Sequence, residues 1–391
     1  MTLSLCTYVI GLYLIDKGPF DAGLFFADSN DLFCCRPPKY FSMIEEADAP
    51  YTPPSHAKNA AAVGWMVTGA IGFAGMSSLS NLLSDHSSGR FFSQPCDWHL
   101  VALVRSAFAL VLAIILIRIA RAPVIIFGPP ALWLRSLAGS ASLLCNFYAL
   151  AHLPTGDALT ISNVYPVWIV ILSRIFFGHR MTLSTGVLLM ISFSGVLCIA
   201  QPKFQSGDYW APCVALFASF ATAFAMVGLH QLGNLDSRTV VAHFSMTGAV
   251  TMLIVSLVQA AMKHEAVTAL LGLNTVSAGQ WVLLLLVGGA GTVGQFCLTK
   301  AYATGLPAYV ALASMTQVVF ALLFEFFLDR GVLADVYHGR PFSWMTLIGI
   351  PLVLFPAAWL AVLRARLTSE ESETIAEVLS EEPAKLDPQE K

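Results

Sequence analysis

Three ionisable side chains stand inside long apolar stretches of this sequence. Arg105 lies seven residues into one stretch, His243 lies at a similar depth in another, and Glu325 is flanked by Phe324 and Phe326. A charged group in the middle of a membrane costs roughly 2.5–3.5 kcal/mol on insertion scales, so each of the three is a functional candidate. Such side chains bind charged solutes and carry protons across membranes.

Each of these side chains also has a structural alternative. Arg105 offers a fixed positive charge to an anionic or carboxylate-bearing solute, or else reaches the headgroups or the carbonyls of a helix end. His243 can titrate near neutral pH, or can be a hydrogen-bonded histidine between helices. Glu325, buried among phenylalanines, can hold a proton and couple transport to it, or can pair with Lys300. Asp157 is expected at the outer surface.

Amide side chains occur at matching places in the two halves of the chain. Asn146 and Asn163 belong to the first half, and Gln295 and Gln317 belong to the second. An amide in a membrane either joins helices, at about 0.6 kcal/mol per hydrogen bond, or acts as an uncharged ligand for a solute. Both readings stay open for these four residues.

Aromatic residues and a proline complete the candidate solute site. Tyr148, Tyr165 and Trp168 could form its walls, although single aromatic residues in helices often only pack. Pro166 removes one backbone hydrogen bond and is expected to kink its helix. The residues predicted to contact a solute are Arg105, Asn146, Tyr148, Asn163, Tyr165, His243, Gln295 and Gln317.

The composition requires a membrane around these residues. Of the 391 residues, 57% are apolar and 12% are charged, and the mean hydropathy is +0.71. Soluble domains carry roughly 25% charged residues, so the chain is predicted to be a polytopic membrane protein. A net charge of -3 without a basic stripe argues against a nucleic-acid partner.

Motifs for enzyme, metal or cofactor chemistry are missing or out of context. The eight cysteines form no CxxC pair, and His264-Glu265 lacks the second histidine of a zinc-binding HExxH motif. Residues 289–294 fit GxGxxG, but they lie in the middle of an apolar segment, where small residues indicate close helix packing. We therefore expect no metal, no cofactor and no enzymatic activity.

Ten apolar segments are long enough to cross a membrane, which predicts an all-α fold. Five fall in a first half and five in a second. The segments are Ala60–Leu82, Trp98–Ile119, Ala131–Leu150, Thr155–Phe177, Thr182–Ala200, Trp210–Leu232, Val240–Ala261, Gln280–Tyr302, Pro307–Leu328 and Ser343–Leu363.

The two halves show an internal repeat. At a constant offset of 149 residues, Gly139 aligns with Gly288 and Asn146 with Gln295. After a short slip, the stretch from Ser162 aligns near Ser314. Because five spans per half is an odd number, equivalent helices enter from opposite faces, which predicts two inverted five-helix repeats.

The chain is predicted to have four parts. Residues 1–58 form a poorly ordered extension, 59–203 the first repeat, 204–366 the second repeat, and 367–391 a disordered tail. The apolar run Leu3–Ile15 is too short to span a membrane, and Met43 is an alternative start. More Lys and Arg flank the segments on one side, Arg135 counted among them, which predicts cytoplasmic termini, with the plasma or inner membrane as the expected location.

Several short motifs resemble a known family. They are Leu103-Val104-Arg105-Ser106, Asn146 to Leu150, Ile161 to Val167, and Phe176 to Arg180, with Gln295-Phe296 and Leu312 to Gln317 in the second half. They are similar to the EamA-type domain of the drug/metabolite transporter superfamily. This resemblance implies a ten-helix carrier with cytoplasmic termini and a central cavity between the repeats. His179 stands where the family often has an acidic residue, and an insertion follows Arg330.

The predicted function is secondary active transport of a small organic solute or metabolite by alternating access, driven by protons or by exchange. No GxxxxGK[ST] loop is present for direct use of ATP. Two alternatives stay open: a membrane sensor or assembly subunit built on a carrier fold, and an intramembrane lipid-modifying enzyme. The expected partners are the solute and the bilayer, with a homodimer left open.

Overall fold

The computed structural model describes residues 56–84, 96–123, 125, 127–153, 155–177, 183–201, 210–263, 276–330 and 343–359. Within these residues the regular secondary structure is α-helical, which confirms the predicted all-α class. Most of the predicted N-terminal extension and all of the predicted tail lie outside the described residues. The four-part division therefore stays a prediction.

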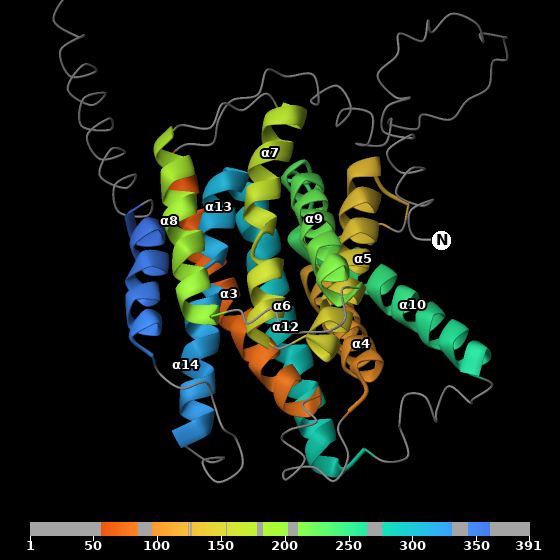
Figure 1. Ribbon diagram of the computed structural model, residues 1–391. Helices are drawn as coiled ribbons and strands as arrows, with labels where there is room; N and C mark the ends of the chain where they lie inside the picture. Colours follow the sequence, from red (N-terminus) through yellow and green to blue (C-terminus); the bar gives the residue numbers. More distant parts are fainter. Residues whose placement is uncertain are drawn as a thin grey trace, which may run out of the picture. The chain divides into compact units, whose positions relative to one another are not determined.

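The helices follow one another with short connections, and Figure 1 shows their arrangement. A last described helix, Trp344–Trp359, follows the labelled ones. The labelled helices are α3 (His56–Ser84), α4 (Trp98–Ala120), α5 (Pro130–His152), α6 (Thr155–Ser162), α7 (Tyr165–Phe177), α8 (Leu183–Ala200), α9 (Trp210–His230), α10 (Ser237–Lys263), α12 (Ala278–Thr304), α13 (Pro307–Ser314) and α14 (Gln317–Arg330).

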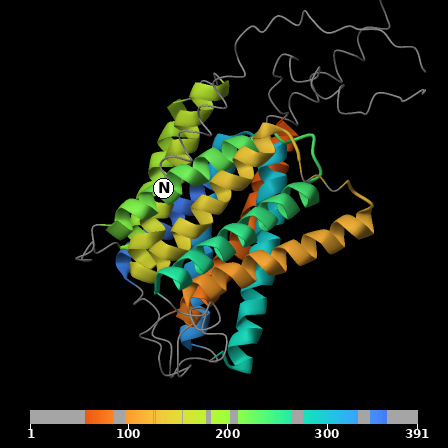
Figure 2. The same ribbon diagram turned by 90° about the vertical axis from the view of Figure 1, so that its right-hand side faces the viewer.

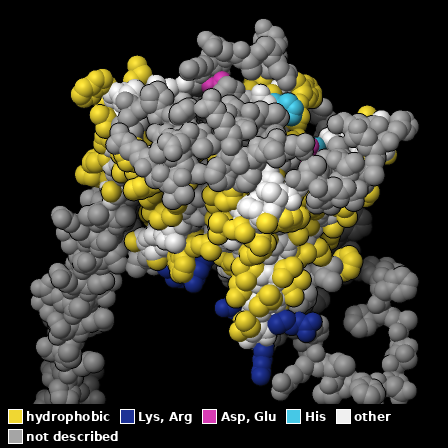
Figure 3. Space-filling model, turned by 90° about the horizontal axis from the view of Figure 1, so that it is seen from below, with side chains coloured by type: hydrophobic (Ala, Val, Ile, Leu, Met, Phe, Trp, Pro, Cys, Tyr) yellow, Lys and Arg dark blue, Asp and Glu magenta, His cyan; other side chains and the backbone are white. Residues whose placement is uncertain are grey.

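The described surface is suited to lipid. Seven segments, of 18 to 27 residues, are long and apolar enough to cross a membrane. Large apolar side chains such as Ile119, Val187 and Leu286 are exposed, and hydrophobic side chains dominate the coloured surface in Figure 3. The chain is an integral multi-pass membrane protein. α5 is not among the seven although it has 23 residues, because its sequence carries an arginine, a histidine and several small polar residues.

The main helix contacts join the two halves of the chain in a symmetric pattern, in line with the predicted repeat. α3 packs most extensively on α12, and α5 packs most extensively on α9. In the repeat, α3 corresponds to α9 and α5 to α12, so each contact is the image of the other. α4 packs on its own counterpart α10, and Figures 1 and 2 show these two helices side by side. The two halves of the chain therefore interlock.

The fourth and ninth predicted spans are each broken into two helices. α6 ends at Ser162 and α7 begins at Tyr165, while α13 ends at Ser314 and α14 begins at Gln317. Both breaks come after eight residues, at positions 152 residues apart, in line with the alignment of Ser162 and Ser314. The ninth segment keeps its predicted bounds, since Pro307–Leu328 is one stretch of 22 residues that is long and apolar enough to cross a membrane.

Different residues cause the two breaks. Pro166 is the second residue of α7, where its missing N–H is tolerated, and it would clash with the carbonyl of Ser162 in a continuous helix. The second break contains no proline. There the hydroxyls of Ser314 and Thr316 donate to the carbonyls of Ala311 (2.5 Å) and Ala313 (2.7 Å), a pattern that bends helices.

The glycine-rich stretch of α12 serves close helix packing, as predicted. A Cβ at Gly72 of α3 would lie 2.8 Å from the carbonyl oxygen of Ala290 and 2.9 Å from the backbone nitrogen of Gly294. A Cβ at Gly294 would in turn lie 2.9 Å from the ring of Phe73. The backbones of α3 and α12 therefore touch where small residues meet.

Candidate functional site

Arg105 is buried near the middle of the described helices. α4 begins at an N-cap formed by Asp97, whose carboxylate accepts a hydrogen bond from the backbone of His99 at 2.8 Å. Two turns later the Arg105 side chain is 2% exposed. Its Nη2 donates to Oε1 of Gln295 on α12 at 3.4 Å, and its Nε would lie 3.2 Å from a Cβ at Gly291. The glycine thus leaves room for the guanidinium group.

A second buried arginine, Arg135, faces the first. It lies in the second turn of α5, is 1% exposed, and packs over Gly139, where an added Cβ would approach its Nη1 to 2.3 Å. The ring of Phe244 on α10 lies against both guanidinium groups, with its centroid 4.4 Å from Cζ of Arg135 and 5.7 Å from Cζ of Arg105. We call Arg105 and Arg135 the arginine pair.

Arg135 was not among the site residues expected from the sequence. Only four residues of the apolar segment Ala131–Leu150 precede it, so it counts toward the charges at a membrane face. The structure adds that its side chain is buried in the protein interior. A usable signal was present: the next residues, Ser136, Gly139 and Ser140, are small, and small residues leave space for a long side chain along one helix face.

The donors around the arginine pair lack acceptors. Nε and Nη1 of Arg105, Nε of Arg135 and Nε2 of Gln295 are buried without hydrogen-bond partners. Tyr302, at 0% exposure, lies within electrostatic range of Arg135. In the part of the chain that the structure describes, no carboxylate forms an ion pair with either arginine. Most of these unpaired atoms can only donate, so the site lacks an acceptor.

Polar contacts between α5 and α10 hold the arginine pair in place. Nδ1 of His243 lies 2.7 Å from the hydroxyl of Ser136, and the hydroxyl of Ser140 donates to that of Thr247 at 3.3 Å. The ring of Trp133 contacts the His243 ring edge to face at 4.8 Å. His243 is therefore a hydrogen-bonded residue between the repeats, next to Phe244 and close to the arginine pair.

Polar residues also connect the two helix breaks. Asn146 of α5 accepts a hydrogen bond from the hydroxyl of Ser162, the last residue of α6, at 2.8 Å. Its own amide donates to the carbonyl of Ser142 at 3.0 Å. The hydroxyl of Tyr165, at the start of α7, donates to that of Ser314, at the end of α13. The broken ends of the two repeats therefore meet each other.

Two further predicted amides lie in or beside the breaks. Asn163 is the first residue of the first break and is 7% exposed. Gln317 is the first residue of α14 and is half-buried. Irregular backbone at membrane depth is stable only where protein or a water-filled cavity surrounds it, and Asn163, Met315 and Thr316 are all buried.

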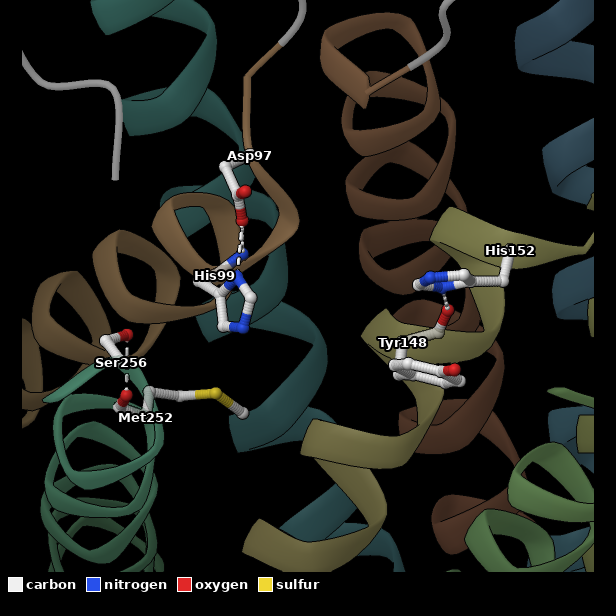
Figure 4. Close-up of polar contacts among 6 residues, drawn as sticks. All are labelled: Asp97, His99, Tyr148, His152, Met252 and Ser256. Carbon is white, nitrogen blue, oxygen red and sulfur yellow. Dashed lines mark hydrogen bonds and ion pairs between the residues drawn. The ribbon is translucent and has the colours of Figure 1, made fainter. Parts of the chain in front are cut away.

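Tyr148 lies apart from the arginine pair, near one end of α5. Its ring stacks on His152 at 4.0 Å and contacts Trp98 edge to face at 6.0 Å. Figure 4 shows this end of α5 near the start of α4, where Nδ1 of His99 lies 2.5 Å from the carboxylate of Asp97. Tyr148 thus belongs to an aromatic and histidine group at the helix ends.

The carboxylates lie elsewhere in the protein. Glu325 is 5% exposed on α14, a helix that packs on α3 and α8. Lys300, which the sequence offered as its partner, lies with Nζ 4.2 Å from the centroid of the Trp65 ring. Asp157 is 2% exposed, so its expected place at the outer surface is corrected.

Comparisons with known proteins identify the fold. Residues 60–201 match the EamA-like transporter family. The match covers the predicted first repeat almost completely, so the family resemblance seen in the sequence is confirmed.

The chain is also similar to individual proteins from bacteria, yeast and mouse. The pseudopaline exporter CntI of Pseudomonas aeruginosa is 28% identical over 56% of this chain and 74% of the exporter. A probable transport protein of Saccharomyces cerevisiae is 23% identical over 65% of this chain and 73% of that protein. Solute carrier family 35 member G1 of Mus musculus is 25% identical over 50% of this chain and 54% of that protein.

A solved crystal structure shares the fold at a TM-score of 0.56, with 18% identity over 77% of this chain and 97% of that chain. The family and the relatives are transporters by name, which indicates a transporter rather than an enzyme at the general level.

Proposed function

We propose that this EamA-type protein is a secondary active transporter that moves a small organic solute across the membrane by alternating access. The observation that carries the proposal is the arginine pair, buried where α4 and α5 of the first repeat meet α10 and α12 of the second. A site between two inverted repeats can open to either side when one repeat rocks against the other.

The helix breaks support the same proposal. Carriers with inverted repeats bind their solutes near interrupted helices, whose freed backbone groups and helix ends serve as ligands. Here the two interrupted helices touch through Tyr165 and Ser314. Tyr165 also makes a side-chain hydrogen bond with Tyr302, which lies within electrostatic range of Arg135. The breaks and the arginine pair are therefore parts of one region.

Coupling is a further element of the proposal. Glu325 is the carboxylate that we propose to carry a proton, and His243, hydrogen-bonded to Ser136 one residue after Arg135, is a second titratable candidate. We also propose cytoplasmic termini, from the excess of Lys and Arg on that side, and the bilayer and the solute as partners. Exchange of one solute for another is the alternative source of energy.

Reconstitution tests the proposed function directly. Purified protein in liposomes loaded with a mixed metabolite extract should exchange internal for external labelled solute, and protein-free liposomes should not. Glu325→Gln should keep exchange while removing its dependence on a pH gradient. Folded, correctly sized protein that exchanges nothing across a broad panel would refute the transporter, and ligand binding without exchange would indicate a sensor.

A further inference from the structure

We propose that the arginine pair is the recognition site for a small organic dianion, such as a dicarboxylate or a monophosphate ester. This inference rests on the proposed transport function for its physiological meaning, but binding at the site can be tested without transport. Its basis is that Arg105 and Arg135, both buried, offer unpaired donors at the interface of the two repeats.

The charge of the site argues for two negative charges on the solute. Both guanidinium groups lie against the ring of Phe244, so their Cζ atoms are no more than about 10 Å apart and the two like charges repel each other in the protein interior. No carboxylate compensates either charge within the described residues. A dianion neutralises both at once, whereas a neutral or cationic solute leaves the repulsion in place.

The hydrogen-bonding groups also favour an oxyanion. Arg105 uses only Nη2, in a long hydrogen bond of 3.4 Å to Gln295, and its Nε and Nη1, which point from different edges of the guanidinium group, have no acceptor. Carboxylate and phosphate oxygens are the acceptors that guanidinium groups bind most strongly. Nε2 of Gln295 adds one more unpaired donor. Such donors are costly to bury unless a ligand supplies their acceptors.

Glycines make room for the two guanidinium groups. Gly291 stands under Arg105, and Gly139 stands under Arg135 and Phe244. A Cβ at Gly139 would lie 2.3 Å from Nη1 of Arg135 and 2.8 Å from Cε2 of Phe244. The small residues of the internal repeat thus provide the space in which the two charged groups and the shared ring lie.

Thermal shifts of purified full-length protein test the inference through a series of probes that differ in charge. Succinate and glycerol 3-phosphate should raise the melting temperature, because a ligand that binds only the folded state stabilises it. Butyrate should do so only at concentrations at least tenfold higher, and succinamide and putrescine should have no effect. Comparing succinate with glycerol 3-phosphate separates carboxylate from phosphate recognition.

Variants assign the binding to the two arginines. Arg105→Gln and Arg135→Gln should each weaken binding of the best dianion by about 10- to 150-fold, the effect of one charged hydrogen-bonding group. Gly139→Ala keeps both charges but displaces Arg135, and it should weaken binding as well. Arg118→Gln, on the exposed end of α4, is the matched control and should bind like the wild type. Gel filtration confirms that each variant is folded.

Failure of the inference and failure of the proposed function give different results. Stabilisation by succinamide or putrescine and none by either dianion would overturn the dianion site, and transport of such a neutral or cationic solute would still support the carrier. Dianion binding without exchange in liposomes would overturn the carrier and leave the site. Equal dianion affinity in wild type, Arg105→Gln and Arg135→Gln would also overturn the inference.

Discussion

Replacing Arg135 by methionine should stabilise the ligand-free protein while removing its transport activity. The side chain is 1% exposed, its Nε has no acceptor, and no carboxylate of the described residues pairs with it. An uncompensated buried charge is a cost that a protein keeps for function. Methionine has a similar length and is flexible, so it can fill the same space over Gly139.

The size of the effect follows from two opposing contributions. Placing an arginine in the middle of a membrane helix costs roughly 2.5–3.5 kcal/mol on insertion scales. The contact with the Phe244 ring, at 4.4 Å, returns about 0.5–2 kcal/mol. The difference predicts that Arg135→Met raises the free energy of unfolding by about 0.5–3 kcal/mol, which is an increase of the order of a few degrees in melting temperature.

Tryptophan fluorescence during heating of detergent-solubilised protein measures the stability, and exchange in liposomes measures transport. The control is Arg118→Met, because Arg118 is exposed in the last turn of α4, where a positive charge is favourable. This control should be slightly less stable than the wild type and keep transport. An Arg135→Met protein that melts several degrees lower would show that the arginine has a structural partner and would refute the reasoning.

Three further predictions concern packing, the helix breaks and pH. Gly72→Ala should destabilise the protein by about 1–3 kcal/mol, because its Cβ meets backbone atoms of α12. Gly64→Ala, with nothing within 4 Å of the added Cβ, should instead stabilise it by about 0.5–1 kcal/mol. Equal melting temperatures of the two variants would contradict this. Asn146→Ala should lower the free energy of unfolding by about 1–2 kcal/mol, because it removes the hydrogen bond from Ser162 and the one to Ser142. An unchanged melting temperature would show that these hydrogen bonds do not stabilise the first break. Burial, reinforced by Asp97, raises the pKa of the Cys96 thiol from 9.0 to about 11. Since the folded state holds this proton more tightly, stability should fall as the pH rises from about 9 to about 11, and Cys96→Ser should make this loss smaller.

The sequence predicted the membrane environment, the all-α class and the family correctly, because these depend on composition and on the period of apolar residues. The helix boundaries also agree closely; for example, α4 begins at Trp98 as expected. The breaks in the fourth and ninth spans were harder to predict. Pro166 gave a signal for the first break, but the second depends on Ser314 and Thr316 bonding to their own backbone, a pattern that also occurs in unbroken helices.

The candidate site was likewise predictable from the sequence only in part. Arg105, His243 and Gln295 were recognisable one by one, because polar residues in apolar segments are costly and rare. Their assembly with Arg135, Phe244 and Tyr302 was not predictable, since these six residues come from four helices that are distant in sequence. Tyr148 and Glu325 looked equally suitable in the sequence, yet they lie with other neighbours.

By itself, the sequence determined that the chain is a membrane protein and that it carries charges within its apolar segments at a high energetic cost. It also predicted an internal repeat. These properties follow from the chemistry of each side chain and from its local helical period. Only the tertiary structure decided which charges face each other, because the interlocking of α3 with α12 and of α5 with α9 brings the two repeats together. That packing brings Arg105 and Arg135 against the same phenylalanine ring, and no local pattern contains this relation.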